Sequence, residues 1–142
     1  MYWLPLCRFM SNLPKTILCV DDDPDDRQFI CDAINHAAPD YSVIEAHNGV
    51  EALQYLDKAK ASADLPCLIV LDINMPLMDG KQTLSRIKVD PLLVNVPIVM
   101  FSTSSNPMDK ALFLRMGVEL ITKPSDITHL NLVVHNLLAH CA

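Results

Sequence analysis

The most constraining feature of this sequence is an uninterrupted apolar run that ends in a carboxylate. The run is Cys67-Leu68-Ile69-Val70-Leu71, and Asp72 follows it directly. A strand with one face in solvent alternates apolar and polar residues, whereas a strand without that alternation is covered on both faces. The run therefore predicts a central strand of a parallel sheet that has helices on both sides.

Four more short apolar runs are separated by segments with helical spacing. Together the predicted strands cover residues 16–20, 41–46, 67–71, 96–101 and 118–122. The helical segments between them start at capping residues or prolines, which are typical of helix N-termini; the caps that we predict include Asp23, Asn48, Asn106 and Ser125. Five such βα units predict one α/β domain with a doubly wound parallel sheet.

Length and charge narrow the classes of function. The chain has 142 residues and is 51% hydrophobic, which suffices for the core of one domain. Its net charge is −6 and its 11 Lys and Arg are scattered, so direct binding of nucleic acid is disfavoured. No apolar stretch approaches the ~18 residues of a membrane span. The acidic residues are mostly Asp, 14 against 3 Glu, and five of them fall within residues 21–26.

The five cysteines are odd in number and form no C-x-x-C pair. Because three of them lie inside apolar segments, we expect buried free thiols and a reducing, cytoplasmic compartment.

The first residues lie outside the repeating pattern. We interpret residues 1–13 as an N-terminal extension that is disordered or precedes the true start, and residues 14–142 as the folded domain.

Polar residues gather where the predicted strands end. They are Asp21 and Asp22 after the first strand, Asp72 after the third, Ser102 and Thr103 after the fourth, and Lys123 and Pro124 after the fifth. In an open α/β sheet, ligands bind beyond the carboxyl ends of the strands. Three carboxylates, a hydroxyl and an amine are therefore predicted to meet at one rim.

The electrostatics of that rim favour a divalent cation. Carboxylates that lie close together in a partly dry site repel each other, and one of them titrates high if it stays unpaired. Mg²⁺ accepts one or two carboxylates and keeps several waters, while Lys123 can balance part of the remaining charge. A carboxylate beside Mg²⁺, an amine and a hydroxyl can attack a phosphoryl donor and form an aspartyl phosphate.

With these motifs in order, the sequence resembles a response-regulator receiver domain of two-component signalling. The resemblance covers roughly residues 15–141 and is carried by Asp21-Asp22, Leu71-Asp72-Ile73-Asn74-Met75-Pro76-Leu77-Met78-Asp79-Gly80, Ser102 and Lys123-Pro124. It implies a (βα)5 flavodoxin-like sheet with strand order 2-1-3-4-5. The loops at Asp23-Pro24 and Asp90-Pro91 are most similar to small stand-alone response regulators, including those partnered with bacterial phytochromes.

The resemblance assigns a role to each matching residue. It implies that Asp72 is the phosphoacceptor and that Mg²⁺ is held by Asp22, by Asp21 through water, by Asp72 and by the backbone carbonyl of Asn74. The side chain of Asn74 lies where the rate of dephosphorylation is tuned. Ser102 matches the switch hydroxyl and Lys123 the lysine that contacts a phosphoryl oxygen. The bond before Pro124 is expected to be cis.

Two positions depart from the family pattern. Thr103 is bulkier than the Ala or Gly common there, so we expect it to restrict access to Asp72. Leu120 stands where the family often has an aromatic residue. We therefore expect coupling from Ser102 to the outer surface to use an element other than a rotating ring.

The resemblance also implies partners. A histidine kinase or a phosphotransfer protein would donate the phosphoryl group to Asp72, and a downstream protein would read the result. We expect a signalling role rather than an enzyme with its own substrate, and output by protein contact rather than DNA binding. The outer edge of the last helix is a candidate surface for a partner or for a homodimer.

Alternative readings of the same residues remain open. A phosphohydrolase with an Asp nucleophile commonly has a second Asp two residues on, where this chain has Asn74. A receiver that is not phosphorylated and acts as a binding module is disfavoured because the acids and Lys123 are all present. Asp23, Asp25 and Asp26 are best explained as acids at a helix N-terminus. The spacing of the Asp cluster also resembles an EF-hand start, but it lacks the Gly at the sixth position.

Overall fold

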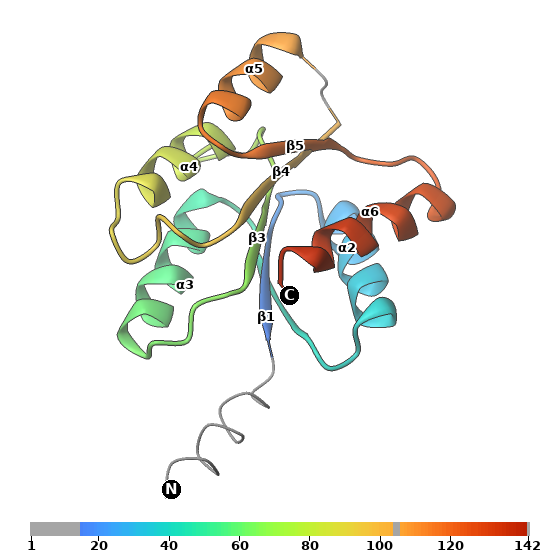
Figure 1. The fold of residues 1–142 in the computed structure, drawn as a ribbon, viewed down its shortest axis with the longest axis horizontal. Helices are drawn as coiled ribbons and strands as arrows, with labels where there is room; N and C mark the ends of the chain where they lie inside the picture. Colours follow the sequence, from blue (N-terminus) through green and yellow to red (C-terminus); the bar gives the residue numbers. More distant parts are fainter. Residues whose placement is uncertain (1–14, 104–105, 142) are drawn as a thin grey trace, which may run out of the picture.

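The computed structural model describes residues 15–103 and 106–141 as one five-stranded parallel sheet with helices on both faces (Figure 1). The strand order is β2-β1-β3-β4-β5, which confirms the predicted topology. In chain order the elements are β1 (Thr16–Val20), α2 (Pro24–Ala37), β2 (Ser42–Ala46), α3 (Gly49–Ala61), β3 (Leu68–Leu71), α4 (Gly80–Lys88), β4 (Ile98–Ser102), α5 (Pro107–Arg115), β5 (Glu119–Thr122) and α6 (Ile127–Ala139).

Successive side chains of the inner strands enter two separate cores. In β1, Leu18 and Val20 pack toward α3, α4 and α5, whereas Ile17 and Cys19 pack toward α2 and α6. Side chains alternate between the two faces of a strand, so each inner strand needs apolar residues at every position. All four residues of β3 are buried, as the apolar run predicts, while the edge strands β2 and β5 are partly exposed.

Side-chain caps start the helices, and most of them are those predicted. Asp23 accepts hydrogen bonds from the backbone N–H groups of Asp25 and Asp26, and Asn48 and Asn106 cap α3 and α5 in the same manner. The prediction that Ser125 caps α6 is wrong. Asp126 is the cap, because its carboxylate accepts from the N–H of His129 at 2.9 Å and lies directly before the first helical residue.

The expectation that the cysteines are free thiols is wrong for two of them. Cys67 and Cys141 form a disulfide, and Cys19 and Cys31 are free and buried. The two bonded residues are 74 positions apart, and the return of α6 to the start of β3 brings them together. The predicted extension, residues 1–13, lies outside the described residues. Within the described part of the chain, no helix has the length and apolarity needed to cross a membrane.

Candidate functional site

Two neighbouring strands bring two acidic side chains together. The N–H of Asp72 donates to the carbonyl of Val20 at 3.0 Å, which continues the pairing of β1 with β3 past their last residues. Asp21 and Asp72 therefore lie side by side just beyond the sheet, with side chains only 8% and 9% exposed. Asp21 and Asp72 thus meet at the carboxyl ends of β1 and β3, as the sequence predicts.

Asp22 completes an acidic cluster with Asp21 and Asp72. One carboxylate oxygen from each residue lies within 4.8 Å of the other two, and Asp22 is exposed while the others are buried. Three carboxylates at this separation repel one another, and hard oxygen ligands are those that Mg²⁺ prefers. The donor set therefore fits a divalent cation that is open to solvent on the Asp22 side.

Lys123 reaches the cluster from the end of β5. Its Nζ is 2.6 Å from Oδ2 of Asp21, 3.0 Å from Oδ2 of Asp26 and 3.7 Å from Oδ1 of Asp72. Its side chain is 10% exposed, and its backbone N–H donates to the carbonyl of Ser102 at 2.8 Å. The lysine is thus positioned by the ends of both β4 and β5.

Asp26 is a member of this site that sequence reasoning assigned only to the helix start. It lies in the first turn of α2, and its carboxylate is 40% exposed. Its separation of 97 residues from Lys123 left no local pattern that could have revealed the pair.

The environment shifts two pKa values in the cluster. Burial, together with the negative charge of Asp21, raises the pKa of Asp72 from 3.8 to about 6, against the opposing effect of Lys123. Burial alone would lower the pKa of Lys123, but its hydrogen bonds with Asp21 and Asp26 and the charge of Asp72 raise it instead. The lysine is therefore a permanent cation, and Asp72 is the carboxylate that is costly to ionise.

The loop after β3 holds Asp72 through close backbone contacts. The N–H of Ile73 donates to Oδ1 of Asp72 at 2.9 Å, and the N–H of Gly80 donates to the carbonyl of Ile73 at 2.7 Å. A Cβ on Gly80 would lie 2.1 Å from the carbonyl oxygen of Asp72. Only glycine allows this approach, so Gly80 helps to fix the acid at the end of its strand.

The other predicted site residues lie around the same rim. Ser102 is 1% exposed at the end of β4, and Thr103 follows it in an exposed position. Asn74 is exposed in the loop after Asp72. Leu120 lies in β5 and packs against the core formed with α3, α4 and α5. The strand β4 therefore lies between Leu120 and the strand that ends at Asp72, and Leu120 has apolar neighbours.

The expectation of a cis bond before Pro124 is wrong. No peptide bond among the described residues is cis, and Lys123 and Pro124 are among them. The trans form is favoured by about 0.5–1 kcal/mol for a bond to proline. Lys123 reaches all three acids from the trans backbone, so its contacts do not require the cis form.

Comparison with known proteins identifies the family. The family model of the response regulator receiver domain matches residues 17–135. Response regulator Rcp1 of Synechocystis is 34% identical over 101 residues, which are 70% of this chain and 69% of that protein. Further curated relatives are longer, and the chain spans between 8% and 52% of their length.

Solved structures agree with this assignment. Phosphorylated RcpA, a cyanobacterial phytochrome response regulator, superposes with a TM-score of 0.79 at 34% identity, covering 88% of this chain and 91% of its own. The Mn²⁺-bound form of Rcp1 superposes with a TM-score of 0.77 at 29% identity, covering 89% and 93%. The chain belongs to the response regulator receiver domain family, whose members are phosphoaccepting signalling regulators of two-component systems.

Proposed function

We propose that Asp72 accepts a phosphoryl group in a reaction that needs Mg²⁺ at the acidic cluster. The observation that carries this proposal is the joint placement of three carboxylates within 4.8 Å and of the Lys123 amine 3.7 Å from Asp72. Phosphoryl transfer needs a nucleophile, a site for a cation and a fixed positive charge, and all three lie together at this rim. A lone carboxylate at a strand end would not support it.

The cation would be held by Asp21, Asp22, Asp72 and the backbone carbonyl of Asn74. When bound, Mg²⁺ supplies positive charge that lowers the repulsion among the carboxylates and the phosphoryl oxygens. The donor set is equally compatible with Mn²⁺, the ion that the solved form of Rcp1 contains. We infer Mg²⁺ because it is the commoner partner of phosphoryl groups in proteins.

The chain's own residues supply the remaining chemistry. A carboxylate oxygen of Asp72 attacks the phosphorus, and the leaving group departs from the opposite side. Lys123 stabilises the negative charge on the phosphoryl oxygens, because its cation already lies within 4 Å of Asp72. The hydroxyl of Ser102 would donate to another phosphoryl oxygen, and Thr103, beside it, would restrict the approach of donors and of water.

Phosphorylation would alter the surface formed by β4, β5 and α6. The new charge on Asp72 attracts Lys123, and the backbone of Lys123 is bonded to that of Ser102 at 2.8 Å. Movement at the site is thereby communicated to two strands at once. Since Leu120 has no ring to rotate, we infer that this backbone link carries the coupling.

We propose that the phosphoryl donor is a histidine kinase or a phosphotransfer protein and that a second protein reads the phosphorylated surface. The likeness to RcpA, a phytochrome response regulator, favours a phytochrome kinase as the donor. These partners would place the chain in the cytoplasm. The acidic charge of −6 argues against nucleic acid as the target.

Intact-mass analysis after incubation with acetyl phosphate and Mg²⁺ tests the proposal. We expect an adduct of one phosphoryl group that disappears with Asp72→Asn and persists with Asp40→Asn, a matched change at an exposed acid far along the sequence. Loss of the adduct on chelation of Mg²⁺ would support the metal. An adduct that survives Asp72→Asn, or no adduct with any small donor, would overturn the proposal. Steady turnover of a phosphomonoester would favour the phosphohydrolase instead.

A further inference from the structure

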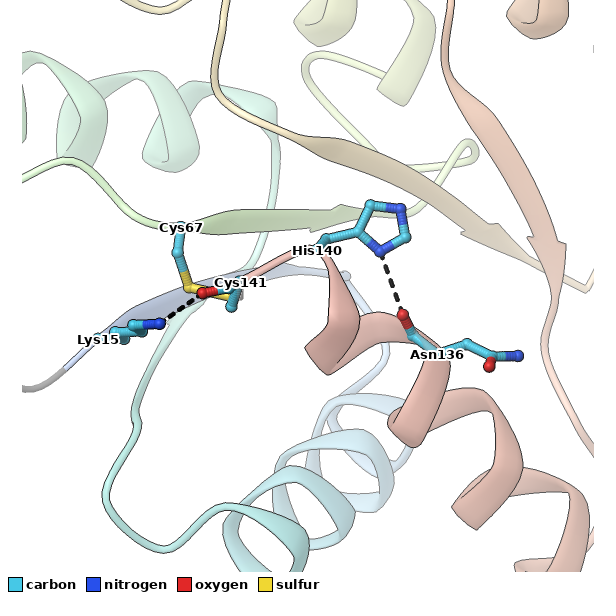
Figure 2. Close-up of a disulfide and its surroundings, with 5 residues drawn as sticks. All are labelled: Lys15, Cys67, Asn136, His140 and Cys141. Carbon is cyan, nitrogen blue, oxygen red and sulfur yellow. Dashed lines mark hydrogen bonds between the residues drawn. A yellow bond between two sulfur atoms is a disulfide. The ribbon is translucent and has the colours of Figure 1, made fainter.

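A disulfide lies at the amino end of β3, and the acidic cluster lies at the carboxyl end of the same strand. Cys67 directly precedes β3 and Cys141 follows α6, with their Cα atoms 5.0 Å apart (Figure 2). Asp72 follows the same strand at its other end, so the four residues of β3 separate the bond from the proposed phosphoacceptor by about 16 Å. The two covalent sites therefore flank one buried strand.

The end of α6 is linked to the starts of two strands, to β3 by the disulfide and to β1 by a hydrogen bond. The amine of Lys15, at the start of β1, donates to the carbonyl of Cys141 at 2.6 Å, as Figure 2 shows. The same amine lies 5.9 Å from the centre of the Tyr41 ring, just before β2. Cys141 is 5% exposed, although it lies beyond the last helical residue. The contacts that hold the C-terminal turn thus include one covalent bond, one charged hydrogen bond and the approach of His140 Nε2 to Glu119 of β5 at 3.7 Å.

Apolar packing attaches the preceding turns of α6 to the rest of the domain. Leu130, Val134 and Leu137 insert into the core shared with α2, and the helix has exposed residues such as Leu132 on its outer side. The helix begins at Ile127, four residues after Lys123. The C-terminal turn that the disulfide holds therefore lies at the far end of α6 from the lysine of the site.

We propose that the Cys67–Cys141 disulfide is a reversible, redox-sensitive link that holds the C-terminal end of α6 to the start of β3. This inference rests on the proposed signalling function and the cytoplasmic location it implies, because a disulfide in a reducing compartment is usually transient, catalytic or redox-sensing. The sulfur of Cys67 belongs to a partly exposed residue, which gives an attacking thiolate access. Two molecules of a small thiol reduce the bond to two cysteine thiols and become one small disulfide, and the reverse reaction restores the bond with release of both thiols.

Opening the bond has a predictable effect on stability. The disulfide closes a loop with a sequence separation of 74, and loop closure of that size restricts the unfolded chain strongly. We expect the thermal midpoint to fall by about 10 °C on reduction. Because Cys141 follows the last helical residue of α6, the loss of order should be concentrated in the C-terminal turn of that helix.

The test uses the full chain equilibrated in glutathione buffers of defined ratio. Thiol alkylation with peptide mapping should find a linked Cys67–Cys141 peptide at oxidising ratios and two new alkylation sites at reducing ratios. On reduction, hydrogen exchange should become at least about tenfold faster at the amides of residues 137–141, and these amides should exchange before those of β1 and β3. The double variant Cys67→Ser, Cys141→Ser should behave as the reduced protein at every ratio; if it does not fold, the reduced wild-type chain provides the same comparison.

Matched variants separate this proposal from others. Cys31→Ala removes a buried free thiol and should keep the full redox shift. Asp72→Asn should also keep the full redox shift, so that a failure of phosphoryl transfer can be told apart from a failure of the redox-sensitive disulfide. Absence of the linked peptide, a bond that glutathione leaves intact in the folded protein, or reduction without faster exchange in α6 would each overturn the proposal.

Discussion

Replacing Asp72 with Asn should stabilise the metal-free protein at neutral pH. The carboxylate of Asp72 is 9% exposed and lies beside Asp21, so ionising it in the folded state is unfavourable. Asparagine has nearly the same shape without the charge. Lys123 keeps its two shorter contacts, with Asp21 and Asp26, when Asp72 is neutral.

The magnitude follows from the pKa. A rise in the pKa of Asp72 from 3.8 to about 6 corresponds to about 3 kcal/mol, which solvent screening reduces to about 2 kcal/mol. Below pH 3.8 the carboxyl group is protonated in both the folded and the unfolded chain, and its stabilising preference for the folded state is fully present. As the pH rises through about 6, the folded protein loses that proton and the contribution disappears.

Thermal unfolding in EDTA measures this effect. Asp72→Asn should melt within about 1 °C of the wild type at pH 4 and roughly 6 °C above it at pH 7.5. Asp40→Asn, at an exposed position, should follow the wild type at both values. An equal difference at the two pH values, or a variant less stable than the wild type at pH 7.5, would refute the reasoning.

Four further changes test the packing and the site. Gly80→Ala should destabilise the protein by about 3 kcal/mol in urea unfolding, because the new Cβ would lie 2.1 Å from a backbone oxygen. Gly117→Ala, with φ of 72° and open space around it, should cost only about 1 kcal/mol. Leu137→Ala should lower the free energy of unfolding by about 3 kcal/mol, since the side chain of Leu137, on α6, is fully buried. Lys123→Ala should slow adduct formation from acetyl phosphate by a factor of at least about 10 while Asp72 remains the labelled residue.

The fold was predictable because its strongest signals are local. The apolar run before Asp72 identified a central strand, and Asp23 and Asn106 marked helix starts by side chains that bond backbone groups two or three residues away. The site was predictable to the extent that its members end strands, since parallel strands end at one edge of a sheet.

The features that the sequence did not predict depend on how distant segments pack together in the folded chain. Cys67 and Cys141 meet only because α6 runs back along the sheet, and no spacing rule connects positions 74 apart. Asp126 and Ser125 are both good caps, and one residue of difference in the start of α6 decides between them. The place of Asp26 at the site depends on the angle between α2 and the end of β5.

That place of Asp26 leads to a last prediction about how Lys123 is used. The Lys123 amine is 3.0 Å from Asp26 but 3.7 Å from Asp72. Asp26 therefore competes with a phosphoryl group on Asp72 for the positive charge of Lys123. Asp26→Asn should weaken that competition. Because the carboxylate of Asp26 is 40% exposed, the contact is worth about 0.5 kcal/mol, and adduct formation should be about twofold faster.

The charge change itself needs a control. Asp25→Asn removes one negative charge from the same first turn of α2, so its effect on the rate measures the change in overall field. The rate with acetyl phosphate and Mg²⁺ should therefore rank Asp26→Asn above Asp25→Asn and the wild type. A slower rate for Asp26→Asn than for Asp25→Asn would mean that Asp26 holds the lysine in its productive position, in which case the acid is a positioning residue of the site and not a competitor.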